Sequence, residues 1–148
     1  MYEIPADEEI VEKIRQWRPD FLAFSDMTQQ YRFALRLARA VKRAMPAVPV
    51  AIGGVHAIMC TRQIVNDDFW DYIGVGECDE AFPELIDKLA AGDPTARDTL
   101  NFLVRNPDGS YQENPLGPYP DPADIAPTDY ELYDLPHMLP RKNGWQSM

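Results

Sequence analysis

The chain has 148 residues and a formal net charge of −10 at pH 7, with 45% hydrophobic and 26% charged residues. This length allows one domain with a buried core and is short for two. The negative charge argues against a nucleic-acid partner, because proteins that bind nucleic acid need a basic face to displace counterions. The sequence has no apolar run of membrane-spanning length and no signal-peptide pattern, so we expect a cytoplasmic protein without membrane contact.

Patterns of helix and strand alternate from the N-terminus. Residues 6–17 carry apolar side chains at helical spacing and acidic residues in the first turn, where they suit the positive end of the helix dipole. Residues 21–24 form a short apolar run, which predicts a strand buried on both faces. Residues 29–45 show an apolar stripe with basic residues off it, which predicts an amphipathic helix with a solvated basic face.

The alternation continues to residue 92. A second strand is predicted at residues 48–52, a shorter helix at 57–65, a third strand at 70–75 and a helix at 79–91. Buried strands separated by helices imply a parallel sheet. We therefore predict an α/β fold, namely a flavodoxin-like (Rossmann-like) doubly wound parallel sheet.

The sequence changes character after Gly92. Residues 100–104 and 111–114 flank the turn sequence Asn-Pro-Asp-Gly, which predicts a β-hairpin. From Pro115 onward, frequent prolines with scattered aspartates are typical of an extended linker. We therefore divide the chain into an α/β domain (1–93), a hairpin (94–115) and a Pro/Asp-rich linker (116–148).

A binding site is predicted where the three strands end. In an open parallel sheet, ligands bind outside the carboxyl ends of the strands. Residues 25–28, 53–56 and 74–77 follow the three strands and are rich in glycine and in small or hydroxyl side chains. Each glycine pair is explained equally well by a tight turn, since glycine accepts a positive φ. Three such edges together favour a groove for a flat or extended ligand.

The same segments resemble a known family. RPDFLAFSDMT, VPVAIGGVHA and WDYIGVGECDE are similar to the cobalamin-binding domain that precedes the catalytic barrel in B12-dependent radical SAM enzymes. That family shows a Ser-x-Met/Leu-Thr strand end, a Gly-Gly-x-His-Ala turn and a Gly-Glu-x-Asp/Glu turn. The resemblance covers roughly residues 7–135, with the hairpin and linker similar to the segment that leads into the barrel.

The resemblance implies a function and a set of contacts. The chain would be a cobalamin-binding module of an enzyme of methyl transfer or related radical chemistry, with no catalytic residue of its own. The iron–sulfur cluster and S-adenosylmethionine would belong to a downstream catalytic domain or a partner chain. The residues that would contact the cobalamin are Ser25, Met27, Thr28, Gly53, Gly54, Val55, His56, Ala57, Gly76 and Glu77.

The sequence departs from the family pattern in several ways. It has neither the Asp-x-His-x-x-Gly motif whose histidine binds cobalt nor the Cys-x-x-x-Cys-x-x-Cys motif of the iron–sulfur cluster. Cys60 and Cys78 have no disulfide or cluster spacing, so we expect no metal ligands. The chain begins at what would be the helix before the third strand of a full domain, which suggests a fragment. Such a sheet would have an open edge, so we predict that the chain is stable only with a partner, as a homo-oligomer or with its missing part.

Several candidate residues allow two readings. His56 is either a contact to the corrin edge or its nucleotide tail, or a residue that holds a turn, and cobalt ligation has the least support. The hydroxyls of Ser25 and Thr28 could donate to the nucleotide tail or cap the helix that follows, with Thr28 as its N-cap, and the two roles are compatible. Glu77 either accepts hydrogen bonds from a ligand amide or is a solvated carboxylate at the start of a helix.

Two other functions compete with cobalamin binding. A phospho-acceptor signalling domain would use Asp26 at the end of the first strand, but the acidic pair and lysine that it needs are absent. A non-catalytic α/β module would bind a nucleotide or a protein through its strand ends or its proline-rich segment.

Overall fold

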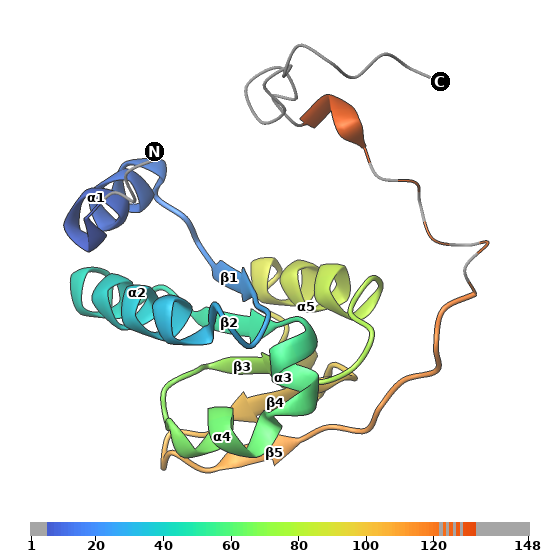
Figure 1. The fold of residues 1–148 in the computed structure, drawn as a ribbon. Coiled ribbons are helices and arrows are strands. Elements are labelled where there is room, and N and C mark those ends of the chain that lie inside the picture. The colour runs from blue at the N-terminus through green and yellow to red at the C-terminus, as the bar shows by residue number, and fades with distance from the viewer. Residues whose placement is uncertain (1–5, 122, 124, 126, 128, 133–148) are drawn as a thin grey trace.

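The computed structural model describes residues 6–121, 123, 125, 127 and 129–132. Its centre is one sheet of five strands in the order β1-β2-β3-β4-β5 (Figure 1). No helix in this part of the chain is both long and apolar enough to cross a membrane. The strands are β1 Leu22–Ser25, β2 Val50–Gly53, β3 Tyr72–Gly74, β4 Phe102–Arg105 and β5 Tyr111–Glu113.

Helices fill the connections much as the sequence predicted. The helix predicted at residues 57–65 is in fact two short helices, because Cys60 between them has non-helical backbone angles. A short 3-10 helix after residue 93 was not predicted. The elements are α1 Asp7–Trp17, α2 Tyr31–Ala44, α3 Val55–Met59, α4 Thr61–Asn66, α5 Ala81–Ala90, η1 Pro94–Asp98 and η2 Tyr130–Leu132.

The strand pairing confirms the predicted α/β architecture and extends it. β1, β2 and β3 are parallel neighbours, with Ala23 opposite Ala51 and Ala51 opposite Tyr72. β4 and β5 form the predicted antiparallel hairpin. The hairpin also pairs with the parallel strands, since β4 runs antiparallel to β3. The sequence did not predict this continuation of the sheet.

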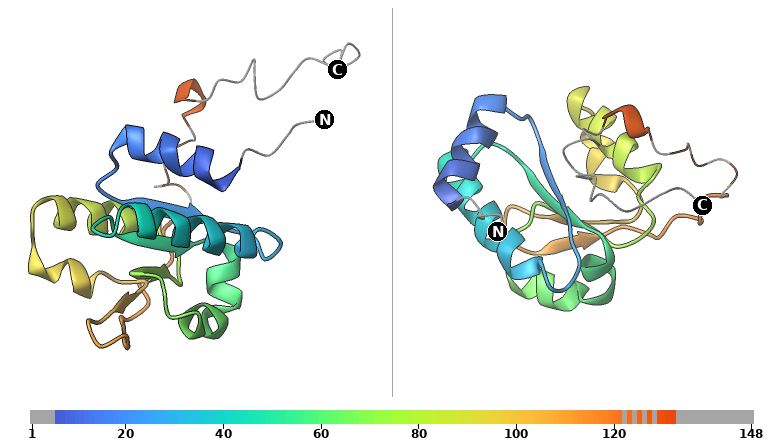
Figure 2. Two further views of the ribbon diagram at one scale, coloured as in Figure 1. Left: turned by 90° about the vertical axis from the view of Figure 1, so that its left-hand side faces the viewer. Right: turned by 45° about the horizontal axis from the view of Figure 1, so that its top comes forward.

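Two apolar cores cover the two faces of the sheet, and Figure 2 shows helices on both sides. On one face, α2, α3 and α4 bury Tyr31, Ala57 and Ile64 against the strands. On the other face, α5 and η1 bury Leu85 and Ala96. Val50, Ala51 and Ile52 of β2 are buried because the strand lies between these two layers, whereas Gly53 at its end is half-buried. This arrangement is the doubly wound packing that the alternation of elements predicted.

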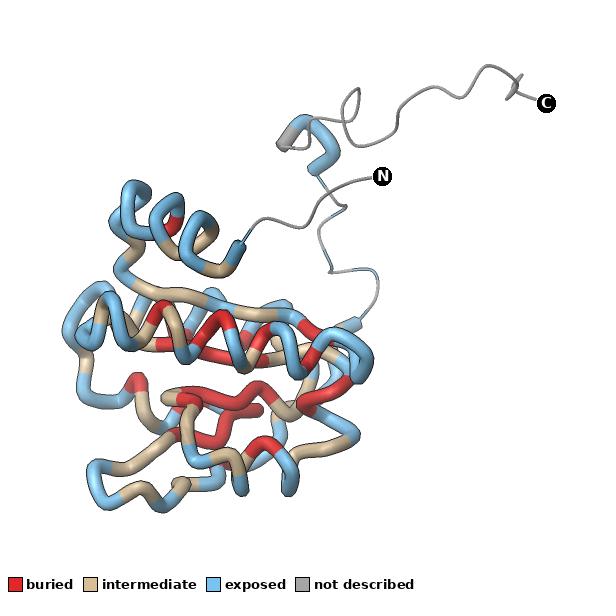
Figure 3. The backbone as a smooth tube through the Cα atoms, turned by 60° about the vertical axis from the view of Figure 1, so that its left-hand side comes forward, coloured by how far each residue is buried: buried red, intermediate tan, exposed pale blue. Residues whose placement is uncertain are grey.

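The burial of β1 differs from the sequence prediction. It was predicted to be buried on both faces, but Ala23 and Ser25 are exposed while Leu22 and Phe24 are half-buried. The reason is that β1 is an edge strand covered on only one face. There Leu22 and Phe24 pack against a third apolar cluster, which is formed by Ile14 of α1 and by Leu37 and Val41 of α2. Figure 3 shows that α1 itself is mostly exposed. Its buried residue, Ile14, packs against Leu37 and Val41 of α2.

The segment after β5 has no helix or strand between residues 114 and 121. That is consistent with the extended segment predicted from its prolines. Residues 133–148 of the predicted linker lie outside the described residues.

Candidate functional site

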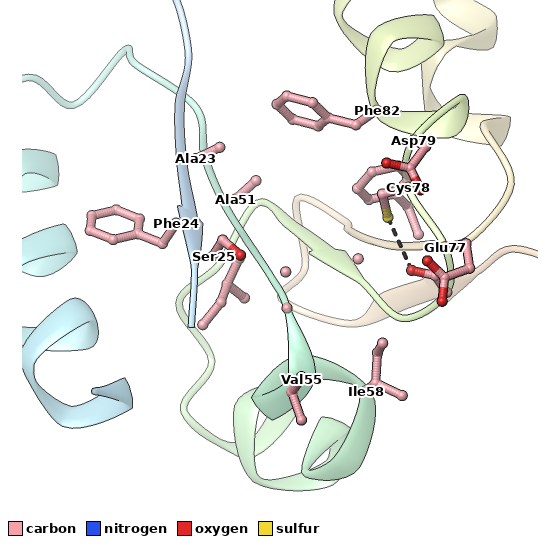
Figure 4. A pocket seen from close by; sticks show the side chains of 16 residues that line it. Ala23, Phe24, Ser25, Ala51, Val55, Ile58, Glu77, Cys78, Asp79 and Phe82 are labelled. Atoms are coloured by element: carbon pink, nitrogen blue, oxygen red, sulfur yellow. Dashed lines mark hydrogen bonds between the residues drawn. The ribbon is translucent and has the colours of Figure 1, made fainter. Parts of the chain in front are cut away.

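A cavity of about 480 Å³ lies at the carboxyl ends of the parallel strands. It is bounded by the ends of β1, β2 and β3, by the start of α3 and by the loop that leads into α5 (Figure 4). This is the edge at which the sequence predicted a groove. Its volume falls within the range of sites that take small molecules and cofactors.

Small residues form the floor of this pocket. Ala23 pairs with Ala51 and Ser25 pairs with Gly53 across the β1–β2 interface. Because side chains alternate along a strand, these four residues face the same side of the sheet. A Cβ atom added at Gly53 would meet no atom within 4 Å, so the space above this glycine is open. The floor is therefore flat and accessible.

Aromatic and aliphatic side chains form the walls. Phe82 at the start of α5 projects toward the floor, and Val55 and Ile58 project from α3 (Figure 4). Val55 is 60% exposed and Ile58 45%, so both extend the apolar wall to the mouth of the pocket. Phe24 contributes mainly backbone, since its ring packs edge-on against Trp70 on the opposite face of the sheet.

The turn from β2 into α3 is locked against the end of β1. Gly54 has a φ of +85°, and a Cβ atom there would lie 2.8 Å from both the backbone nitrogen and oxygen of Asp26. The Asp26 amide donates to the carbonyl oxygen of Gly53, and the His56 amide donates to that of Asp26, both at 3.1 Å. Only glycine allows this approach, which explains the second glycine of the pair.

The loop from β3 into α5 is held by a residue that sequence reasoning missed. Asn101 is buried, has a φ of +67° and donates from Nδ2 to the carbonyl oxygen of Glu77 at 2.6 Å. Its Oδ1 accepts from the Gly117 amide at 2.7 Å. A Cβ atom on Gly76 would lie 2.6 Å from this Oδ1, so Gly76 is needed for the close packing.

Two polar side chains of this loop face the pocket differently. Cys78 is half-buried and its thiol donates to the carbonyl oxygen of Gly76 at 3.3 Å. Burial raises the pKa of the Cys78 thiol, so the group is held in its neutral form. Glu77 is exposed at the mouth, where its carboxylate is solvated.

His56 lies on the other side of the sheet from the pocket. Its ring is 1% exposed and its centroid is 4.2 Å from that of Tyr31 on α2. Nδ1 of His56 lies 3.3 Å from Oγ1 of Thr28, within hydrogen-bond distance. Thr28 does not cap α2, because this helix begins at Tyr31 with Gln30 in the N-cap position and without a side-chain cap. The Thr28 hydroxyl is directed to the imidazole instead.

The Tyr31 ring is itself fixed by polar contacts. Its hydroxyl donates to the Asp67 carboxylate and lies 3.5 Å from Nε1 of Trp70, which donates to it. Burial, together with the hydrogen bond to Asp67, raises the pKa of Tyr31 well above its usual range. A neutral, rigid Tyr31 therefore forms the surface against which the imidazole of His56 packs.

The structure thus divides the residues predicted for the site. Those that line the pocket are Ser25, Gly53, Gly54, Val55, Gly76 and Glu77. Those that do not line it are Met27, Thr28, His56 and Ala57. Met27 is exposed beyond the end of β1, and Ala57 is fully buried in the core.

Other lining residues were not predicted. They are Ala23, Phe24, Ala51, Ile52, Ile58, Gly74, Cys78, Asp79, Phe82 and Phe102. A signal for some of them exists in the sequence, because Ala23, Ser25, Ala51 and Gly53 are small residues at alternate positions of two strands. Phe102 had no such signal, since its place depends on the hairpin pairing with β3.

The competing phospho-acceptor function is disfavoured by the position of Asp26. Its side chain is 8% exposed and Oδ2 is buried without a hydrogen-bond partner. A carboxylate in this place is out of reach of a phosphoryl donor. Across the described residues, no three His, Cys, Asp or Glu side chains are grouped so as to hold a metal ion.

The fold and the pocket define a class: an α/β module with a ligand-sized pocket at the carboxyl ends of its parallel strands, where open α/β sheets bind their ligands. The family model for the B12-binding domain matches residues 2–86, more than half of the chain. The chain therefore belongs to the B12-binding domain family.

Comparisons with individual proteins are consistent with this family assignment. Over 87 residues, 58% of this chain, the sequence is 28% identical to the anaerobic magnesium-protoporphyrin IX monomethyl ester cyclase of Cereibacter sphaeroides. The fold is similar to that of the cobalamin-dependent S-adenosylmethionine radical enzyme OxsB with aqua-cobalamin and S-adenosylmethionine bound (TM-score 0.62), and to the same enzyme with aqua-cobalamin alone (0.60). Both OxsB structures cover 77% of this chain at 13% identity, which shows a shared fold. The chain spans 14% of the cyclase and 16% of the OxsB chain.

Proposed function

We propose that this chain is the cobalamin-binding module of a B12-dependent radical SAM enzyme, and that its pocket holds the nucleotide tail of the cofactor. The observation that carries the proposal is the position of the pocket. Six residues of the family-like strand-end motifs line one cavity: Ser25, Gly53, Gly54, Val55, Gly76 and Glu77.

The pocket suits the nucleotide tail in shape and polarity. The tail ends in a flat, largely apolar aromatic base, which fits a floor of small residues beneath the ring of Phe82. The open space above Gly53 is where such a base would lie against the strand. The hydroxyl of Ser25 can donate a hydrogen bond to the sugar, and the Glu77 carboxylate can accept one from an amide of the corrin ring.

The corrin ring is too large for the cavity and would lie outside its mouth. The exposed side chains of Val55 and Ile58 offer an apolar surface there. Bound cobalamin supplies the group-transfer chemistry, and this chain binds and orients it. His56, buried behind the sheet, is a structural residue in this arrangement and not a ligand to cobalt.

The iron–sulfur cluster and S-adenosylmethionine belong, in this proposal, to a catalytic domain outside the chain. The radical enzymes to which the chain is similar support this division of labour. Such a domain would cover the mouth of the pocket, where the apolar side chains are exposed. The substrate would be determined there.

The open edge of β1 supports a further part of the proposal, namely that another strand pairs with it. Ala23 and Ser25 are exposed, and β1 has one neighbouring strand among the described residues. The strand would come from the rest of the parent protein or from a second copy of the chain. Sedimentation and thermal melting over a concentration series test this. We expect self-association or a melting temperature that rises with concentration, whereas a cooperatively melting monomer would count against it.

Binding of the tail is tested by comparing cobalamin with cobinamide, which lacks the nucleotide. Each is titrated into the 148-residue chain and followed by its visible spectrum. We expect cobalamin to bind at least about tenfold more tightly, because only its tail can enter the pocket. Equal affinities would show that the pocket does not hold the tail. Binding of neither corrinoid would reject the function itself.

A further inference from the structure

Aromatic rings close the end of the pocket that lies farthest from its mouth. On the floor, Ala51 pairs with Ala23 of β1 and with Tyr72 of β3. Phe21, just before β1, packs with Tyr72 in the same apolar core, and the two ring centroids are 5.7 Å apart. The centroid of Phe21 is also 6.0 Å from that of Phe82, which lines the pocket. The small residues of the floor therefore end against three rings.

The side wall near this inner end is apolar as well. Phe102 is 2% exposed, and its Cε1 would lie 3.4 Å from a Cβ atom added at Gly74. Sγ of Cys78 would lie 3.1 Å from the same position. The Cys78 thiol already donates to the carbonyl oxygen of Gly76, and its sulfur is a weak acceptor. Neither side chain can therefore satisfy a polar group of a ligand well.

The backbone of the floor is engaged within the sheet. β2 pairs with β1 on one side and with β3 on the other, so its amides and carbonyls point along the sheet to these neighbours. Besides Cys78, the polar side chains among the described residues that line the pocket are Ser25, Glu77 and Asp79, and all three are exposed. The hydrogen-bonding groups therefore lie toward solvent, and methyl groups and rings lie at the inner end.

A flat base that enters the pocket brings its outer edge to this inner end. Benzimidazole and phenolic bases present carbon at that edge, whereas adenine presents a ring nitrogen and an amino group. Burial of these polar atoms among apolar side chains removes their water without supplying hydrogen bonds. Stacking on Phe82 does not separate the bases, because all of them are aromatic.

We propose that the pocket selects corrinoids by the base of the nucleotide tail: it admits a benzimidazole or phenolic base and discriminates against adenine. Ala23, Ala51 and Phe102 are the residues that set this preference, because they leave the inner end without a hydrogen-bonding partner. This selectivity rests on the proposed function, since the tail must enter the pocket to meet its walls.

The test compares two cobamides that differ in the base, one with p-cresol and one with adenine. p-Cresol has no nitrogen to bind cobalt and adenine binds it weakly, so little energy is spent on detaching either base. Each cobamide is titrated into the 148-residue chain and followed by its visible spectrum. We expect the p-cresol form to bind at least about tenfold more tightly, because the polar edge of adenine is left unpaired.

Two conservative substitutions place a hydroxyl at the inner end. Ala23→Ser changes an exposed residue of the floor, and Ala51→Ser changes a buried one. Ala44→Ser, exposed at the end of α2 and outside the pocket, is the matched control. We expect Ala23→Ser and Ala51→Ser each to reduce the preference for p-cresol at least about threefold, since a hydroxyl can pair with the polar edge of adenine. Ala44→Ser should leave the preference unchanged, and any cobalt–base contribution is the same in every variant.

The outcomes separate this proposal from the proposed function. Equal affinities of the unmodified chain for the two cobamides, or tighter binding of the adenine form, would overturn the selectivity; the adenine amine would then have a partner such as Asp79 at the rim. An unchanged preference in Ala23→Ser would overturn the role of the inner end, whether or not Ala51→Ser folds. In each of these cases the proposed function stands, because the cobamides still bind. Binding of neither cobamide would reject the proposed function, and the selectivity with it.

Discussion

Asn101 donates a hydrogen bond of 2.6 Å to the carbonyl oxygen of Glu77, and so ties the hairpin end of the sheet to the loop that borders the pocket. The same side chain accepts a hydrogen bond from Gly117. One buried amide thus sets the position of the β3–α5 loop and of the segment that leaves the sheet.

Substituting Asn101 with alanine should therefore destabilise the fold by about 2 kcal/mol, because the Glu77 carbonyl and Gly117 amide lose their partner. Cobalamin binding should weaken as well, since the loop loses its anchor. Urea unfolding and a cobalamin titration measure the two effects. Asn66→Ala, an exposed position on α4, is the control and should alter neither by much. A fully stable Asn101→Ala variant would contradict the role given to this residue.

The two adjacent glycines should respond differently to substitution. Gly54→Ala should cost about 3 kcal/mol of folding free energy, because alanine is strained at a φ of +85° and its Cβ would meet the Asp26 backbone at 2.8 Å. Gly53→Ala should cost far less, because its Cβ would enter open space. The folding free energies of the two variants, measured by thermal or urea unfolding, check this prediction. Equal destabilisation would contradict the geometry of the turn.

The two cysteines provide an internal probe of the pocket. Cys78 lines the pocket and Cys60, between α3 and α4, does not. Cyanocobalamin at about ten times its Kd should slow iodoacetamide modification of Cys78 about tenfold. The reason is that only about a tenth of the protein molecules are then free of ligand and able to react. Modification of Cys60 should keep its rate. Mass spectrometry of both peptides over time gives the answer, and protection of both cysteines or of neither would argue against binding in this pocket.

The buried carboxyl of Asp26 should make stability depend on pH. Burial raises its pKa in the folded protein, so the folded state holds this proton more tightly than the unfolded state. Its contribution to stability is therefore complete below the unfolded pKa and is lost as the pH rises through the raised folded value. Asp26→Asn lacks this dependence.

We accordingly expect Asp26→Asn to be more stable than the unmodified chain at pH 7, with an advantage that shrinks as the pH falls toward 4. Urea unfolding of both proteins across this range measures the difference. An advantage that stays constant, or one that grows on acidification, would show that the carboxyl does not carry the predicted burial cost.

The pocket edge could be predicted because its signal is local. Apolar runs that end in glycine or serine mark the strand ends, and parallel strands bring those ends together whatever the details of packing. Six of the ten predicted residues, Ser25, Gly53, Gly54, Val55, Gly76 and Glu77, line the cavity for this reason.

The remaining features depend on contacts between distant segments. The side of the sheet that His56 faces is set by its packing on Tyr31, and the place of Asn101 by the hairpin's pairing with β3. The exposure of Ala23 follows from the edge position of β1. None of these has a periodicity or motif that a single sequence displays.

The central claim is that this chain holds cobalamin across Gly53. The direct test is to mix the chain with hydroxocobalamin, remove unbound corrinoid by desalting, and record the visible spectrum beside that of Gly53→Val. Valine suits a strand and its Cβ would meet no protein atom, so the variant should fold while filling the pocket. We predict corrin bands retained by the unmodified chain and lost from Gly53→Val. Loss from both proteins, or equal retention by both, would contradict the account.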